Sequence, residues 1–454
     1  MAGIYQPQFF YMNLSTGEIQ ATASIYSSAV FSSCGRKRIK FILSFMCLLV
    51  SSFSFSQSAI SGKVVEVGKK TALSNASVFI RGTSKGTVSS ADGSFALQNI
   101  PKGIYELVIS SVGYATIVHP FSTDSLPLTI TIELSLKATE LDAVTVDPYE
   151  EATWAEWGQF FIENFIGTSA AARDTRIVNQ KAIRFRHYRK KGLLLAIADE
   201  PLIIENRALG YRIKYQLEDF IWNAKEQSVI YLGYELFEDM AEGRKRIPKN
   251  WIDNRRKAYL GSMNHFCRSL YNNRLQEESF MVRRLEKKRN TEKDRIRELY
   301  AQQARRAIKS GGVTVLRLGS TSATIGAGPG TDSSGYYETV LRQPDYLDVY
   351  GADLLKADSL VTVRNDSSRV LFFPNYLHIT YTGAKEEKEY LQRQMQGSRK
   401  PWHRVSSIFL QSGSPVIIEK NGLYYPAAEV FALGYWAWSE KISHLLPLEY
   451  GLYE

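Results

Sequence analysis

From Ala59 to Val146 the chain alternates apolar with polar or small residues, and glycines interrupt the pattern at short intervals. A period of two puts every second side chain on one face of a β-strand, which indicates half-buried strands. Asp92-Gly93 is the strongest turn signal, because Asp-Gly suits a tight hairpin. About seven short strands in roughly 90 residues predict an all-β sandwich of the Greek-key kind over residues 59–147. Its apolar positions are Val64, Val78, Ile80, Phe95, Leu97, Tyr105, Leu107, Ile109, Ile130, Ile132 and Leu134.

Four motifs in this stretch carry a family resemblance: SGKVV, NASVFIRGTSKGT, DGSF and SSVGY. Together they resemble the carboxypeptidase-regulatory-like domain that opens many exported proteins of Bacteroidetes type, TonB-dependent receptors among them. The segment LKATELDAVTV at 136–146 is similar to the one that leads into the plug domain of those receptors. The resemblance implies a scaffold or interaction module, since in true carboxypeptidases this domain is an accessory part.

An export signal precedes the predicted sandwich. A positive cluster, RKRIK at 36–40, is followed by the short apolar run FILSFMCLLV at 41–50 and then by small residues. The order matches a secretory signal peptide, and the run is shorter than the roughly 20 residues of a membrane-spanning helix. We expect a signal peptide at 36–58, a doubtful N-terminal extension at 1–35, and a periplasmic or outer-membrane-associated mature chain without a transmembrane span.

The remaining residues, 148–454, predict an α+β region with an antiparallel sheet and a charged helical insertion. Trp154, Trp157, Phe161 and Phe165 recur at helical spacing, so this helix either docks on a core or lies on a membrane surface. Strand signals follow at 182–240 as an antiparallel meander, and 249–309 is expected to be helical. Strand signals resume from Val313 onward. This region resembles the C-terminal part of uncharacterised exported proteins with the same N-terminal sandwich.

The sequence predicts no catalytic, metal or cofactor site. A zinc carboxypeptidase needs a His-x-x-Glu pair, and no histidine of the chain has glutamate three positions later. The histidines are His119, His187, His265, His378, His403 and His444. Gly82 to Gly86 matches Gly-x-Ser-x-Gly, but between two strands it predicts a turn, because the serine of that motif must follow a strand and open a helix. Cys267, the thiol left after leader removal, is expected to pack as a small apolar residue rather than react.

Charge and aromatic residues leave two binding surfaces to consider. The net charge is +10, and the run from Glu277 to Lys309 holds eleven basic and six acidic residues. Its mixed signs are typical of a solvated helix, with an acidic partner as the alternative, and export argues against nucleic acid. Gly319 to Gly335 lacks the spacing of a phosphate-binding loop. The aromatic tail is expected in a core, with glycan stacking as the alternative; it comprises Tyr424, Tyr425, Phe431, Tyr435, Trp436 and Trp438.

The pattern therefore favours a non-enzymatic cell-envelope protein. In this hypothesis the sandwich is an interaction or spacer module, and the α+β region binds an envelope protein or a glycan. The first alternative is a peptide or glycan hydrolase with a site that linear motifs do not reveal. Carboxylates for such a site are Glu200, Glu205, Glu218 and Asp219. The second alternative is an accessory subunit of an outer-membrane transport or secretion complex.

The leader makes a direct prediction. Expressed in a Gram-negative host, the chain should be recovered from the cell envelope, with an intact mass that shows cleavage near residue 58. Replacing the four basic residues of 36–40 by glutamine should retain the full-length product in the cytosol. Recovery of the unprocessed wild-type chain from the cytosol would contradict the prediction.

Overall fold

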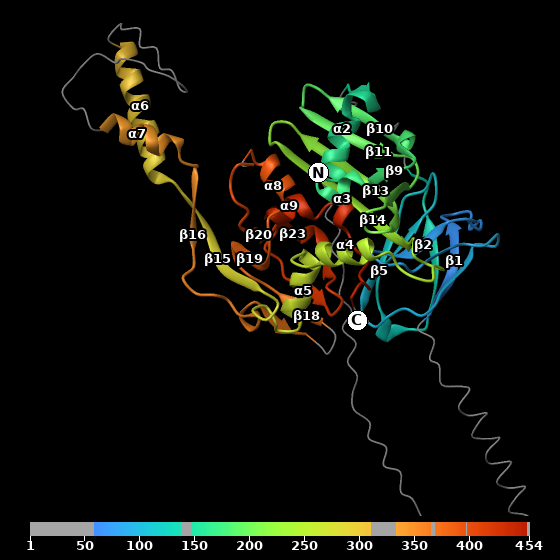
Figure 1. Ribbon diagram of the computed structural model, residues 1–454. Helices are drawn as coiled ribbons and strands as arrows, with labels where there is room; N and C mark the ends of the chain where they lie inside the picture. Colours follow the sequence, from blue (N-terminus) through green and yellow to red (C-terminus); the bar gives the residue numbers. More distant parts are fainter. Residues whose placement is uncertain (1–58, 138–147, 310–332, 365–367, 396, 452–454) are drawn as a thin grey trace, which may run out of the picture. The chain divides into compact units, whose positions relative to one another are not determined.

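The computed structural model describes residues 59–137, 148–309, 333–364, 368–395 and 397–451 (Figure 1). The predicted leader and N-terminal extension lie outside the described residues, as do most of the glycine-rich stretch and of the segment 136–146. Among the helices that the structure describes, none is both long and apolar enough to cross a membrane.

Residues 60–134 form the predicted sandwich of seven strands. One sheet has the order β4-β1-β7, with β1 and β7 parallel, and the other has the antiparallel order β3-β2-β5-β6. The alternating residues from Val64 to Leu134 meet between the sheets, with Leu107 and Ile109 fully buried. The strands are β1 (Ile60–Glu66), β2 (Ser77–Ile80), β3 (Gly86–Val88), β4 (Ser94–Leu97), β5 (Ile104–Ser110), β6 (Ile117–Ser122) and β7 (Leu128–Leu134).

The outer face of the second sandwich sheet is buried as well. Phe79 and Val108 point away from the sandwich core and pack on Leu236 of the following region, with Val118 and Tyr234 at the margin. This contact explains why Val108 is fully buried, although alternation along β5 places it on the outer face.

The turn between β2 and β3 completes this junction. The Gly82 N–H donates to the Glu235 carbonyl at 2.9 Å, and the Gly82 carbonyl accepts from the Leu448 N–H at 2.7 Å. On the next residue, the Thr83 carbonyl accepts from the Phe237 N–H at 2.9 Å. Gly82 has φ of +72°, where other residues are strained, and a Cβ there would lie 3.2 Å from the Leu448 side chain and would press on it, so both features favour glycine.

The first half of the α+β region is a seven-stranded antiparallel sheet covered by α2. Its order is β8-β10-β11-β13-β12-β9, and β14 pairs with β13 along its whole length. The elements are β8 (Glu150–Ala152), α2 (Trp154–Phe165), α3 (Ala170–Arg173), β9 (Thr175–Ile177), β10 (Ile183–Tyr188), β11 (Leu193–Ala198), β12 (Leu202–Asn206), β13 (Tyr211–Asn223) and β14 (Ser228–Asp239).

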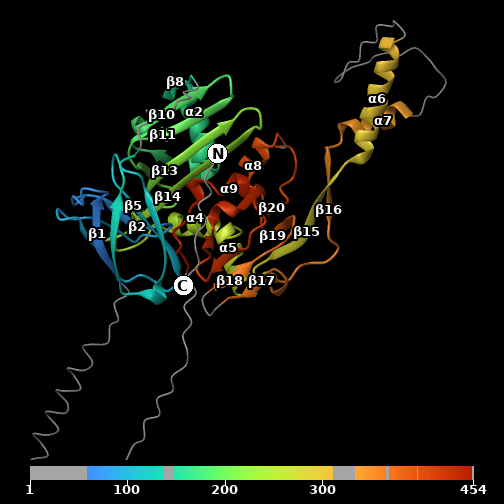
Figure 2. The same ribbon diagram turned by 180° about the vertical axis from the view of Figure 1, so that it is seen from behind.

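Helix α2 docks on a core, as expected. The helix lies on the sheet that contains β10, β11 and β13 (Figures 1 and 2). Phe161 and Phe165 are fully buried, and the Phe161 ring lies 4.7 Å from that of Phe220 in β13. The strands depart from a simple meander, because β11 pairs with the end of β13 and β12 pairs with its beginning. The thirteen residues of β13 are long enough for both partners.

The second half contains two further sheets, with orders β16-β15-β19-β20-β23 and β17-β18-β21-β22. Its helices are α4 (Lys249–Tyr259), α5 (Met263–Tyr271), α6 (Thr291–Lys309), α7 (Ser333–Arg342), α8 (Lys388–Arg393) and α9 (Tyr435–Ser439). Its strands are β15 (Phe280–Arg289), β16 (Tyr346–Tyr350), β17 (Val361–Val363), β18 (Ser368–Leu371), β19 (Tyr376–Lys385), β20 (His403–Leu410), β21 (Val416–Glu419), β22 (Tyr424–Tyr425) and β23 (Val430–Gly434). Single 3₁₀ turns are η2 (Thr123–Ser125), η4 (Gln180–Ala182), η5 (Ala357–Ser359), η6 (Ala427–Glu429) and η7 (Ile442–His444).

The prediction that 249–309 is helical throughout is wrong for one segment. Residues 280–289 form the strand β15, which pairs with β16 and β19. Phe280, Val282 and Leu285 are buried there, and the basic residues between and beyond them reach solvent. Long lysine and arginine side chains occur on the exposed face of a strand as readily as on that of a helix. The many basic residues of this segment therefore obscured the alternating apolar pattern of the strand.

We expect Arg81 to hold the sandwich on the α+β region. Its guanidinium donates to Glu106 at 2.8 Å and lies 3.9 Å from Glu235, a carboxyl whose pKa burial raises. Arg81→Met should lower the free energy of unfolding in urea by about 2–3 kcal/mol, because it leaves two partly buried carboxylates without their cation. As a control, Arg184→Met, which breaks the exposed pair with Asp199, should cost less than about 0.5 kcal/mol. Equal losses in the two variants would contradict this role.

Candidate functional site

A cavity of about 370 Å³ lies between the two halves of the α+β region. Ala170, Ala171 and Asp174 line it around α3, whereas Tyr435, Ser439 and Glu440 line it around α9. The end of α4, the start of α5 and the β12–β13 turn complete the wall. The volume falls within the range of small-molecule sites, which often occur where two structural units meet.

Glu440 is a carboxyl that burial keeps partly protonated near neutrality. Its Oε1 accepts from the backbone N–H of Met263 at 3.0 Å, in the first turn of α5. Burial raises its pKa to about 7, against the opposing effects of that hydrogen bond and of Arg404. At neutral pH a substantial fraction of Glu440 is therefore a carboxylic acid, which can donate a hydrogen bond.

His444 complements Glu440 as a neutral acceptor. Its Nδ1 lies 3.0 Å from the Ser439 carbonyl, which only accepts, so Nδ1 carries the proton and Nε2 holds a lone pair. Burial lowers the pKa of His444, which keeps the imidazole neutral. The pocket thus holds one neutral donor and one neutral acceptor, four residues apart in the chain.

Arg404 and Glu387 also line the pocket, but their polar atoms are already engaged. Arg404 donates to the carbonyls of Leu260 at 2.9 Å and Lys385 at 3.2 Å, and lies 3.6 Å from Glu387. Glu387 accepts from the Tyr435 hydroxyl at 3.1 Å, and the Arg404 guanidinium stacks over the Tyr435 ring. These groups form a rigid wall rather than a free binding group.

The exposed rim carries one charge of each sign. Asp174 follows α3 and Lys257 lies in the last turn of α4, and both side chains are exposed. Among the described residues neither side chain has a hydrogen-bond or ion-pair partner, whereas Asn254 beside them donates to the Ala208 carbonyl. Asp174 and Lys257 are therefore the charged groups that remain available to a ligand.

The carboxylates considered for a hydrolase lie elsewhere. Glu205 pairs with Arg176 at 2.8 Å, and Glu200 accepts from Asn179 at 3.0 Å. Glu218 and Asp219 stand at the irregularity of β13, where the Glu218 Oε1 is buried without a hydrogen bond. None of the four lines the pocket, which instead brings Asp174, Glu387 and Glu440 together. No motif marked these three, because they lie on segments far apart in the chain.

The other residues singled out in the sequence have structural roles. Cys267 is 2% exposed, and burial raises the pKa of its thiol, so it is a packed and unreactive residue. Ser84 lies between β2 and β3, and its hydroxyl donates to Glu449 at 2.6 Å. Among the described residues no group of three or more histidine, cysteine or acidic side chains is placed to hold a metal ion.

The structure weakens the case for both surfaces that the sequence offered as binding regions, the aromatic tail and the charged helix α6. In the aromatic tail, Tyr435, Trp436 and Trp438 are buried, which makes core packing the main role of this segment. The basic residues of α6 are partly neutralised by neighbours, since Arg295 pairs with Glu292 at 2.6 Å. Lys293 and Arg297 both reach Asp345, at 2.8 and 2.9 Å. This pairing weakens the case for α6 as a site for an acidic partner.

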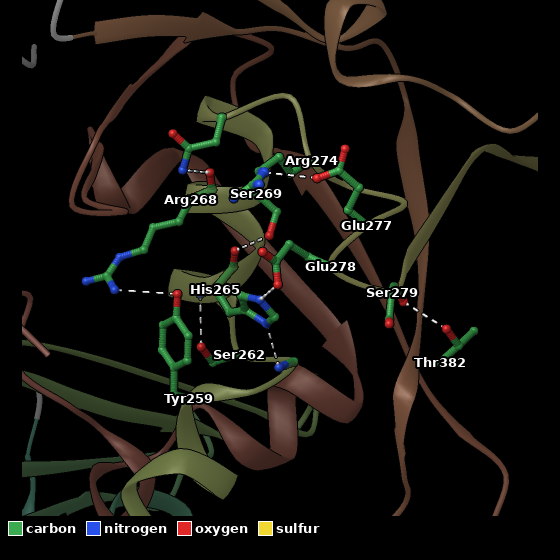
Figure 3. A network of polar contacts seen from close by, with 12 residues as sticks. Tyr259, Ser262, His265, Arg268, Ser269, Arg274, Glu277, Glu278, Ser279 and Thr382 are labelled. Carbon is green, nitrogen blue, oxygen red and sulfur yellow. Dashed lines mark hydrogen bonds and ion pairs between the residues drawn. The ribbon is translucent and has the colours of Figure 1, made fainter. Parts of the chain in front are cut away.

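A polar network surrounds α5, where Arg268 contacts Tyr259 and His265 contacts Glu278 (Figure 3). Arg268 lies against Tyr259 and donates to three main-chain carbonyls, those of Asn421 at 3.0 Å, Leu448 at 2.7 Å and Tyr450 at 2.7 Å. One turn earlier on α5, the His265 Nδ1 accepts from the Gly261 N–H at 3.0 Å and its Nε2 faces Glu278 at 3.2 Å. Burial lowers the pKa of His265 against the opposing effect of Glu278, and the two hydrogen bonds make it a structural histidine.

The raised pKa of Glu440 predicts a pH dependence of stability. Between its usual pKa of 4.5 and the folded value of about 7, the unfolded chain loses this proton while the folded chain keeps it. Stability should therefore fall as pH rises through this window. Glu440→Gln keeps an acceptor for Met263 and removes the titration, so its advantage over the wild type in urea unfolding should grow by about 2–3 kcal/mol from pH 4.5 to pH 8. Glu277→Gln, on the surface, should show no such change, and a constant difference for Glu440→Gln would refute the assignment.

Comparisons with known proteins identify the N-terminal part. No curated protein matches the chain significantly. Three solved structures are similar to parts of it, each with too low an identity and TM-score to support an argument. A type II cohesin–X-dockerin complex from Acetivibrio cellulolyticus is 19% identical over 17% of this chain and 51% of its own, with a TM-score of 0.14. A group B streptococcus pilus 2b backbone protein is 18% identical over 19% of this chain and 43% of its own, with a TM-score of 0.16.

The third structure, a putative membrane-associated protein of unknown function from Bacteroides fragilis, is 10% identical over 80% of this chain and 93% of its own, with a TM-score of 0.15. The family models are more informative. Residues 60–146 match one of them, which confirms the domain that the motifs and the seven strands indicated. The chain therefore carries a CarboxypepD_reg-like domain at residues 60–146.

Proposed function

We propose that this chain is an exported cell-envelope protein that binds a small polar ligand in the pocket between α3, α4, α5 and α9. The sandwich acts as a non-catalytic scaffold that is docked on the ligand-binding region. The observation that carries the proposal is the pocket of about 370 Å³. Its rim offers Asp174 and Lys257, which have no partner in the described part of the chain, and its wall offers Glu440 and His444.

Binding is favoured over catalysis because the carboxyl groups of the wall are held by hydrogen bonds to neighbouring groups. Glycoside hydrolysis needs two carboxyl groups free to act on opposite sides of a bond. Glu387 is held by Tyr435 and Arg404, and Glu440 is fixed by Met263. Fixed polar groups around a preformed cavity orient a ligand well, because they lose little entropy when it binds.

The envelope location rests on the leader at 36–58 and on the family resemblance of the sandwich. Both support export, and neither names a ligand. The second alternative, an accessory subunit of a transport or secretion complex, rests on the similarity of the segment 136–146 to receptors, and most of that segment lies outside the described residues.

Lys257 tests the proposal with simple probes. Thermal unfolding of the mature chain should be followed with acetate, ethylammonium, alanyl-alanine and glycerol, which represent four charge classes. At least one probe should raise Tm by about 2 °C or more at saturation, because binding stabilises the folded state. Lys257→Glu should abolish the shift caused by a probe with a carboxylate, acetate or alanyl-alanine, because it reverses the charge that this group meets. Lys249→Glu, exposed on the same helix, should retain the shift.

If no probe class shifts Tm, or if Lys257→Glu responds like the wild type to acetate and alanyl-alanine, the pocket is not the binding site and the proposal falls.

A further inference from the structure

The free groups of the pocket fall into two pairs with different chemistry. On the exposed rim, Asp174 offers a carboxylate and Lys257 an ammonium, and no ion pair within 4.0 Å joins them to each other or to other described residues. On the wall, Glu440 offers a hydrogen-bond donor and His444 an acceptor, each held in place through its other polar atom. A ligand that contacts all four groups needs a positive and a negative end. Between these ends it needs a hydrogen-bond acceptor for Glu440 and a hydrogen-bond donor for His444.

The rim argues against ligands with a charge of only one sign. A dianion would find Lys257 free but would face Asp174, since the Arg404 guanidinium is occupied by the Leu260 and Lys385 carbonyls and by Glu387. A dication would face Lys257 in the same way. Opposite charges at one rim attract a zwitterion and repel neither of its ends.

The wall adds a requirement in the middle of the ligand. A peptide unit has one N–H donor and one C=O acceptor, which match the free Nε2 of His444 and the carboxylic acid of Glu440. A dipeptide is the smallest molecule that combines an ammonium, a carboxylate and one peptide unit. Its charged ends would form charge-assisted hydrogen bonds at the rim, which are the stronger kind.

We infer that the pocket binds a short peptide with both termini free, with its ammonium at Asp174, its carboxylate at Lys257 and its first peptide unit against Glu440 and His444. This inference rests on the proposed function and narrows it to one class of ligand.

Three related probes test the inference on the mature chain by isothermal titration calorimetry. They are alanyl-alanine, N-acetyl-alanyl-alanine, which lacks the ammonium, and alanyl-alaninamide, which lacks the carboxylate. Alanyl-alanine should bind at least about fivefold more tightly than either blocked form, because each block leaves one rim charge without its partner.

Variants assign the two ends. Asp174→Asn should remove the preference for a free ammonium and leave the preference for a free carboxylate, and Lys257→Gln should do the reverse. The matched controls, Asp253→Asn and Lys249→Gln on the exposed surface of α4, should keep both preferences.

The outcomes separate the inference from the proposed function. Equal binding of the free and blocked peptides overturns the peptide assignment and leaves a ligand pocket. The same follows if acetate binds more tightly than the peptides and is lost in Lys257→Glu, or if ethylammonium binds more tightly and is lost in Asp174→Asn. Absence of binding by every peptide overturns the assignment as well. Absence of a Tm shift with all four charge classes rejects the pocket itself.

Discussion

The buried guanidinium of Arg268 is the contact on which much of this structure depends. A buried cation is costly unless its donors are satisfied, and Arg268 meets this requirement with three main-chain carbonyls. Two of them belong to Leu448 and Tyr450, so α5 holds the end of the described chain. That segment in turn pairs with Gly82 of the sandwich and follows directly on the residues that line the pocket. One side chain thereby links the core of the second half, the segment beside the pocket and the N-terminal domain.

The pocket shows how burial tunes ordinary side chains. Glu440 and His444 are common residues, but the low-dielectric wall favours the neutral form of each, raising one pKa and lowering the other. The protein thereby keeps a donor and an acceptor without burying a net charge. The two charged groups remain at the rim, where water reduces the cost of leaving them unpaired.

The fold was predictable from the sequence where a local pattern determines it. The alternation from Ala59 to Val146 predicted the sandwich, and the aromatic spacing of Trp154 to Phe165 predicted α2 and its burial. The strand β15 was missed because its apolar residues stand among lysines and arginines whose charge suits a helix equally well. The pocket was not predictable, since Asp174, Lys257 and Glu440 lie on distant segments and acquire their roles only from tertiary packing. In the sequence, His444 was considered only as a possible zinc ligand and rejected. The feature that connects it to the pocket is its position four residues after Glu440.

The two-sided burial of β2 and β5 has a consequence for how this domain can be used. Phe79 and Val108 would become a water-facing apolar patch if the sandwich were cut from the rest of the chain. In this chain the sandwich is therefore not an independent domain, because part of its surface is buried against the following region. If gene duplication or fusion transferred the sandwich to another protein, that protein would need an apolar surface in place of Leu236, or Phe79 and Val108 would have to be replaced by polar residues.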